Sequence, residues 1–247
     1  MEQSLGKTIL FTDILGFAYD TRNQNVQFEG MNKQLDLFIM VKNLSPKYAN
    51  IISFAFSDTV VAVSDDNEQV FNFAKELFRQ TWDKYILLRG AIASGRFYDL
   101  RNTQSLTNDA PKNFTTMPII GDGYTKAAQM EKKAPKGCRL FIDRAINIPL
   151  SHCNNIRPLE SNEVQGYLHL QPYAEYIWWN PNDRGVCSGR ITITKLNIDQ
   201  LEQDQNQTGG SLKGYFDKIK DAETSYEIDS LKQRLEHLHK TLEIMSK

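Results

Sequence analysis

The chain alternates short runs of apolar β-formers with longer segments whose apolar residues recur at helical spacing. Residues 7–13 form a β-rich run that ends just before Gly16. Residues 29–44 repeat apolar side chains mostly three and four positions apart, which is the period of a helix; they are Met31, Leu35, Phe38, Ile39 and Val41. The pattern predicts a strand followed by a helix.

Two further β-forming runs, residues 51–56 and 59–63, are separated only by Ser57 and Asp58. So short a connection predicts a tight hairpin, although the dipeptide lacks the glycine that two-residue turns prefer. Asp58 is then expected at the tip of the hairpin.

The remaining periodic segments complete an α+β pattern. Residues 68–82 and 122–133 are amphipathic, while 86–94 and 138–142 are apolar and β-forming. An antiparallel pair among strands linked by crossover helices predicts a ferredoxin-like antiparallel sheet with helices on one face.

The rest of the sequence predicts peripheral parts. Residues 96–118 are polar and long for a connection, so they are expected to be mobile or to form an arm that docks on a partner. Residues 148–182 are rich in Tyr and Trp and predict a cover over the sheet, and 187–196 predict a last strand.

The sequence predicts a domain over residues 1–200, followed by a linker and a C-terminal helix over 201–247. The linker is rich in Gln, Asn and Gly, which is typical of flexible connections. The helix shows a short leucine seam that could pack on its own domain or on a second chain: Leu231, Leu235, Leu238, Leu242 and Met245.

Composition narrows the range of partners. The formal net charge is −1, so no general excess of basic residues draws the protein to nucleic acid or to an anionic membrane. No apolar run is long enough for a transmembrane helix, and no signal-peptide core follows Met1. We therefore expect a cytoplasmic protein that binds neither nucleic acid nor membrane.

Two acids are placed where chemistry is expected, because each follows or interrupts an apolar β-run: Asp13 in FTDILGF and Asp58 in FSDT. Carboxylates from neighbouring strands would repel each other unless cations lie between them. Taken singly, each Asp could instead cap a turn.

Four segments, in this order and at this separation, resemble the catalytic domain of class III adenylate and guanylate cyclases. They are the FTDILGF segment, the hairpin-tip Asp58, the strand RGAIASG that ends in Gly95, and the GDGYTKAA segment that opens a helix at Gly121. The resemblance covers about residues 7–143.

The resemblance implies a two-metal site and a nucleoside triphosphate substrate. Two divalent ions, Mn²⁺ or Mg²⁺, would be bound by Asp13, Asp58 and the carbonyl of Ile14. The backbone amides of the turn at Leu15, Gly16 and Phe17 would hold the triphosphate. Because sites of this family are shared across a two-fold interface, it also implies a homodimer.

The sequence departs from the family on the helix after Gly121. Where the family has an Asn and an Arg that stabilise the transition state, this chain has Thr125 and Gln129. A neutral amide replaces a permanent charge, so an active enzyme needs another cation. Arg89, Arg96, Lys126 and Lys132 lie close in sequence to the site segments. Of these, Arg89, which precedes the glycine-rich strand, is favoured for that catalytic role.

The base-selecting positions also differ from those of purine cyclases. Phe54 and Pro118 occupy them, and neither side chain can hydrogen-bond a base edge. The chain is in this respect similar to the Pycsar pyrimidine cyclases of bacterial anti-phage signalling, which implies cyclisation of UTP or CTP. A purine cyclase, or a degenerate cyclase fold that only binds a ligand, remain the alternatives.

Overall fold

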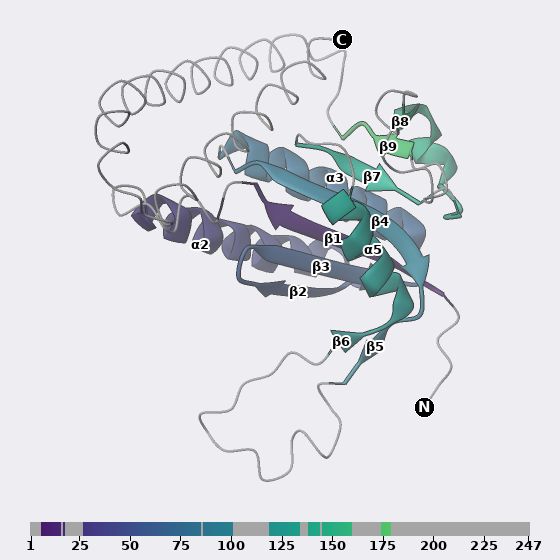
Figure 1. Cartoon of the computed structure of the whole chain (residues 1–247), viewed down its shortest axis with the longest axis horizontal. Coiled ribbons are helices and arrows are strands. Elements are labelled where there is room, and N and C mark those ends of the chain that lie inside the picture. Colours follow the sequence, from purple (N-terminus) through teal and green to yellow (C-terminus); the bar gives the residue numbers. More distant parts are fainter. Residues whose placement is uncertain are drawn as a thin grey trace, which may run out of the picture.

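The computed structural model describes residues 6–15, 17, 27–84, 86–100, 119–133, 138–143, 145–159 and 174–178. They build a sheet of the order β2-β3-β1-β4-β7-β9-β8, in which β4 and β7 run parallel and the other neighbours antiparallel. Figure 1 shows the sheet with its helices.

The strands of the sheet are β1 (Lys7–Ile14), β2 (Ile52–Phe56), β3 (Thr59–Ser64), β4 (Leu88–Gly95), β7 (Leu140–Ile142), β8 (Ile156–Pro158) and β9 (Ala174–Tyr176). The α-helices are α2 (Gln27–Leu44), α3 (Asn67–Asp83) and α5 (Asp122–Lys133), with short 3-10 helices at Ser45–Lys47 and Leu150–Asn155. A separate ladder joins β5 (Tyr98–Asp99) to β6 (Ile119–Ile120). The predicted α+β class, the hairpin and each predicted element in these ranges are confirmed.

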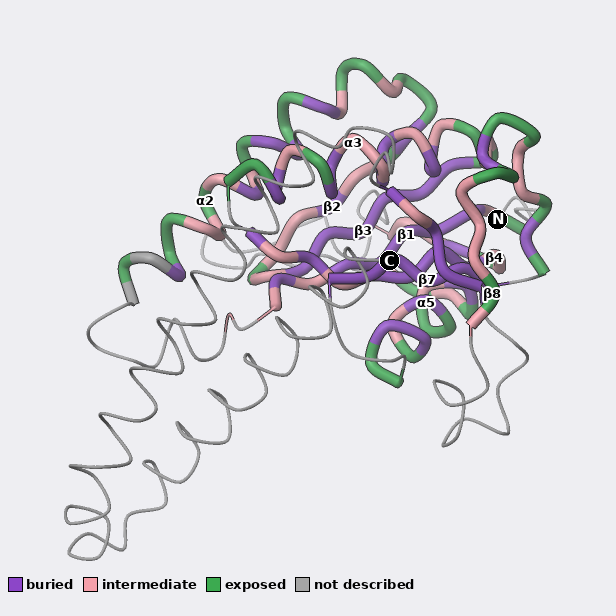
Figure 2. Tube along the Cα trace, turned by 90° about the horizontal axis from the view of Figure 1, so that it is seen from above, coloured by how far each residue is buried: buried purple, intermediate pink, exposed green. Residues whose placement is uncertain are grey.

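The helices cover both faces of the sheet, so the expectation of helices on one face was wrong. Residues of α2 and α3 share a core with Leu10, Val60 and Ile92, whereas α5 packs on Ile9 and Val61, which point the other way. Figure 2 shows α2 and α3 on one side of the sheet and α5 on the other. The middle of each central strand is a short continuous apolar run rather than an alternating one, which is the pattern of a sheet buried on both sides.

Helix α2 buries a different row of residues from the one that its sequence pattern indicated. Leu37, Met40, Val41 and Leu44 are buried, whereas Met31, Leu35 and Ile39 are exposed. The helix carries apolar residues on more than one face, so periodicity alone does not choose the buried one.

Two glycines let α5 lie unusually close to β4. A Cβ atom at Gly95 would come within 2.5 Å of the Cα atom of Gly123, and one at Gly123 within 2.9 Å of the Cα atom of Gly95. Atoms do not approach so closely in packed interiors, so neither position has room for a side chain. The start of α5 is therefore fixed against the sheet by backbone contact.

Several predictions lie outside the described residues: the interior of the polar stretch (101–118), most of the aromatic cover, the strand at 187–196, the linker and the leucine seam. Within the cover, Tyr176 and Trp178 are described and both are fully buried. In the ranges that are described, no helix combines the length and the apolar character needed to cross a bilayer.

Candidate active site

Asp13 lies near the end of β1, between two cross-strand neighbours. Its register partners are Thr59 on β3 and Arg89 on β4, so the three side chains share the face that α5 covers. The hydroxyl of Thr59 donates a hydrogen bond to Oδ1 of Asp13. The central position of β1 thus places one carboxylate between an alcohol and a guanidinium.

Asp58 occupies the hairpin tip, as predicted, and three contacts hold it there. Its carbonyl accepts the amide of Ile14 at 3.0 Å, the Ser57 hydroxyl donates to its Oδ1 at 3.0 Å, and the Gln34 amide donates to the Ser57 carbonyl at 2.7 Å. Ser57 has a φ of 51°, a left-handed conformation that glycine adopts more easily. This unfavourable conformation of Ser57 closes the turn tightly and places Asp58 beside the end of β1.

Asp58 directly precedes Thr59, the register partner of Asp13, so the two acids are neighbours at the end of β1. Burial raises the pKa of Asp13 from 3.8 to about 7, the hydrogen bond from Thr59 opposes that rise, and the charges of Asp58 and Glu131 add to it. The guanidinium of Arg89 lowers the same pKa, but less than these other effects. The ionised form of Asp13 is therefore disfavoured, first by burial and then by the neighbouring acids.

This donor set fits a small divalent cation. Carboxylate oxygens are the ligands that Mg²⁺ prefers, and Mg²⁺ typically uses one or two of them with waters and substrate phosphates rather than a complete protein cage. Among the described residues, no group of three or more His, Cys, Asp or Glu side chains is placed to hold a metal. Asp13 and Asp58 could hold cations jointly with a bound triphosphate.

Arg89, the expected replacement cation, is engaged elsewhere. Its Nε lies 2.7 Å and its Nη2 2.6 Å from Oε1 of Glu131 on α5, and the two side chains are only 13% and 9% exposed. Arg89 on a central strand was expected to need a partner anion, and Glu131 is that anion. Reaching a triphosphate would leave Glu131 buried without its counter-ion.

Thr125 and Gln129 lie on the exposed surface of α5. The Thr125 hydroxyl donates to the carbonyl of Gly121, one turn earlier, at 3.1 Å. No hydrogen bond among the described residues joins either side chain to Asp13 or Asp58. In this chain both residues are exposed to solvent, where a second chain could meet them.

The turn after Asp13 is only partly available to bind phosphate. The amide of Leu15 donates to the carbonyl of Leu87 at 2.8 Å, so it would have to leave that bond to contact a triphosphate. Gly16 lies outside the described residues, and Phe17 packs against the core on the α2 and α3 side.

Phe54 is a core residue in this structure. It is 3% exposed, on the α5 side of the sheet, and its ring lies 5.8 Å from that of Phe97. It faces the same side as Asp13, and Pro118 lies outside the described residues. A base would reach Phe54 only if its aromatic neighbours moved.

Sequence reasoning missed three residues of this cluster: Thr59, Tyr124 and Glu131. Tyr124 packs edge-on against Phe11, and its pKa is raised by burial and then by the charge of Asp13. Cross-strand pairing could have identified Thr59, since it immediately follows the hairpin tip. Glu131 shows no signal in sequence, because its partner is 42 positions away.

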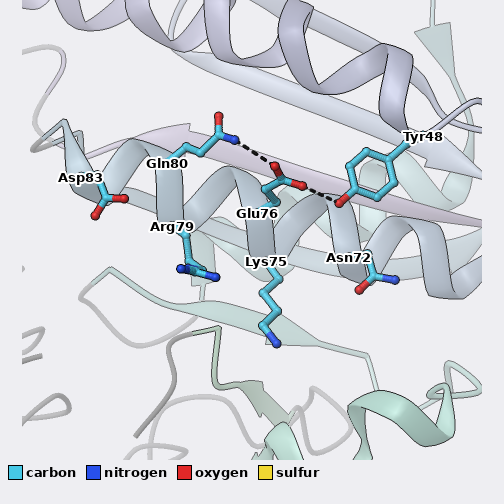
Figure 3. Close-up of a pocket in the computed structure, with 7 residues that line it drawn as sticks. All are labelled: Tyr48, Asn72, Lys75, Glu76, Arg79, Gln80 and Asp83. Carbon is cyan, nitrogen blue, oxygen red and sulfur yellow. Dashed lines mark hydrogen bonds between the residues drawn. The ribbon is translucent and has the colours of Figure 1, made fainter. Parts of the chain in front are cut away.

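A separate hollow lies on the opposite side of the sheet and is not this site. It has a volume of about 400 Å³ and is lined by Tyr48 and polar residues of α3. Figure 3 shows Glu76 at its centre, accepting hydrogen bonds from Tyr48 at 2.8 Å and from Gln80 at 3.0 Å. The acid is already satisfied by these contacts and by Lys47 at 2.6 Å.

Comparison with solved structures identifies the fold as that of class III cyclase catalytic domains. The chain is similar to the guanylate cyclase domain of RhGC from Catenaria anguillulae in complex with GTP, with a TM-score of 0.50 and 16% identity over 71% of this chain and 98% of that one. It is also similar to the non-canonical dimeric guanylyl cyclase domain of RhoGC from Blastocladiella emersonii (0.50, 15%, covering 69% and 93%).

A bacterial light-regulated adenylyl cyclase matches with a TM-score of 0.50 and 12% identity, over 72% of this chain and 53% of that one. No family model matches the sequence, and no curated protein matches it. These likenesses show the fold, and the fold leaves both activity and base preference open.

The raised pKa of Asp13 predicts a pH-dependent stability. Between pH 4 and 7 the folded protein keeps a proton on Asp13 that the unfolded chain loses, so the free energy of unfolding falls as pH rises through this window. Asp13→Asn removes this loss and should be more stable than wild type by about 2 kcal/mol at pH 8, but not at pH 4, allowing for partial solvent screening. Urea denaturation in EDTA at both pH values measures the difference; a constant difference would contradict the assignment.

Proposed function

We propose that this protein is a nucleotidyl cyclase that converts a pyrimidine nucleoside triphosphate, UTP or CTP, into its 3′,5′-cyclic nucleotide and pyrophosphate. The observation that carries the proposal is the meeting of Asp13 and Asp58 at one edge of a class III cyclase fold. Burial and mutual repulsion leave Asp13 with a pKa of about 7, as expected for a carboxylate awaiting a cation.

In the proposed reaction, the 3′-oxygen bonds to the α-phosphorus as the bond to the β-phosphate oxygen breaks. The 3′-hydroxyl loses its proton, and pyrophosphate leaves with the bonding electrons. Divalent ions at such a site lower the pKa of the hydroxyl and neutralise phosphate charge. No side chain has to act as a nucleophile.

The protein's own residues supply position. Thr59 orients the Asp13 carboxylate from the neighbouring strand, and the amide of Ile14 fixes the backbone of Asp58 at 3.0 Å. Because both contacts belong to or adjoin the sheet ladder, the two acids are held before substrate arrives. Such preorganisation reduces the reorganisation needed in the transition state.

The pyrimidine preference is proposed from what the base-reading positions lack. Phe54 is apolar and tightly packed, so it offers no hydrogen bond to a purine edge and little space for a second ring. A one-ring base needs less displacement of the packing around Phe54 than a two-ring base does. Signalling against phage stays a prediction from the resemblance.

The test is to incubate the purified protein with each of the four ribonucleoside triphosphates and Mn²⁺, and to identify cyclic products by mass spectrometry. We expect cyclic UMP or cyclic CMP as the main product. Phe54→Ala should raise the share of purine product, because it removes the ring that limits space. A wild-type preference for ATP or GTP would end the pyrimidine assignment, and an unchanged preference in the variant would end the role of Phe54.

The alternative function is a cyclase fold that binds a nucleotide without turning it over. It is favoured by Thr125 and Gln129, because both are neutral and exposed where an active cyclase would need a cation. If no triphosphate is cyclised but one binds in the presence of Mn²⁺, as measured by calorimetry, that reading replaces the enzyme.

A further inference from the structure

The Arg89–Glu131 pair lies directly beside Asp13. Antiparallel register puts Arg89 opposite Asp13, and side chains opposite each other on adjacent strands have Cβ atoms only about 4.5–5.5 Å apart. Glu131 reaches the guanidinium from α5, and both of its contacts use the same oxygen, Oε1, at 2.7 and 2.6 Å. A cation is therefore held next to the proposed metal ligand by a carboxylate from another element.

Without Glu131 this arrangement would work against cation binding. A buried guanidinium needs an anion, and the nearest remaining carboxylate across the strand pair is Asp13. Arg89 paired with Asp13 would occupy the oxygens that a divalent ion needs and would add like charge at the site. With Glu131 in place, the charges of Arg89 and Glu131 cancel. The carboxylates of Asp13 and Asp58 then remain available to a divalent cation.

We infer that Glu131 is a positioning residue that holds the guanidinium of Arg89 away from Asp13 and so preserves the divalent-cation site formed with Asp58. The inference rests on the metal site of the proposed function. It gives Arg89 a different role from that of a cation for the triphosphate, because its charge is already neutralised by Glu131 at 2.6 Å.

The test measures Mn²⁺ binding to the full chain without nucleotide, from the electron paramagnetic resonance signal of free Mn²⁺. Glu131→Gln should weaken binding at least tenfold, because Arg89 turns to Asp13. The double variant Arg89→Met/Glu131→Gln should bind Mn²⁺ as wild type does, because the competing cation is gone. A merely structural ion pair would leave the double variant no better than the single one.

Asp122→Asn is the matched control. It removes one negative charge from the same helix, but from an exposed pair with Arg96 whose side chains are 55% and 65% exposed. Its Mn²⁺ affinity should equal that of wild type. Circular dichroism checks folding of each variant, and if Glu131→Gln does not fold, the double variant alone decides, since weak binding by it contradicts the inference.

The outcomes separate the inference from the proposed function. Unchanged Mn²⁺ affinity in Glu131→Gln, or no recovery in the double variant, overturns the inference even if wild type cyclises a nucleotide. Wild type that binds Mn²⁺ but forms no cyclic product overturns the function and leaves the inference standing. A double variant with normal Mn²⁺ binding supports the inference whatever its kcat, because the inference concerns the metal site and not turnover.

Discussion

Alanine at Asp13 or at Asp58 should abolish cyclisation while the domain stays folded. Each substitution removes one of the two carboxylates that meet at the end of β1, and neither ion of a metal pair is then held correctly. We expect turnover to fall by roughly a thousandfold or more, equivalent to about 4 kcal/mol of transition-state stabilisation. Product formation with saturating Mn²⁺ measures the loss.

The fold should tolerate both changes. Ionised Asp13 costs the apo protein stability above pH 7, so its removal relieves repulsion, and Asp58 lies in a surface turn. Thermal denaturation in EDTA is the control and should show a Tm at or above that of wild type. Substantial Mn²⁺-dependent activity in either variant would remove the two-metal assignment.

Two inactive variants mixed together should regain activity, because we expect a homodimer whose sites combine Asp13 and Asp58 of one protomer with the α5 surface of the other. Thr125 and Gln129 are exposed and make no contact with the two acids among the described residues, so one protomer shows only part of a site. Asp58→Ala supplies an intact α5 surface, and Gln129→Glu, which puts a negative charge toward the triphosphate, supplies intact acids.

Random exchange of equal amounts gives mixed dimers with one good site each, so activity should return to about a quarter of wild type. Light scattering at the assay concentration should show the dimer, and each variant alone provides the baseline. Additive activity of the mixture, or a fully active monomer, would contradict the shared site.

Local pattern was enough to predict the framework of the fold. The β-runs and helical periods were strong, and the hairpin followed from having only Ser57 and Asp58 between two strands. Placement of α5 was not predictable in the same way, since a helix shows which face is apolar but not which side of the sheet it covers. Continuous apolar runs in β1 and β3 were the available signal for two covered faces.

In the candidate site, too, only the features that depend on local sequence could be predicted. Asp13 and Asp58 were chosen as candidates because each follows or interrupts an apolar run, and strand register makes them neighbours. The pairing of Arg89 with Glu131 depends on contact between elements distant in sequence, as does the burial of Phe54 against Phe97. No spacing rule within one element reports such contacts.

Helix α5 is attached to β4 near both of its ends. Gly123 presses its first turn against Gly95 with no space between the backbones, and Glu131 ties its last turn to Arg89. These points are separated by about 12 Å of helix, with Thr125 and Gln129 between them. A helix attached at one point could rotate about that point, but two attachment points prevent such rotation. The exposed surface of α5 can therefore shift only if β4 shifts with it. In the expected homodimer, any movement of one chain against this surface should therefore carry helix and sheet together.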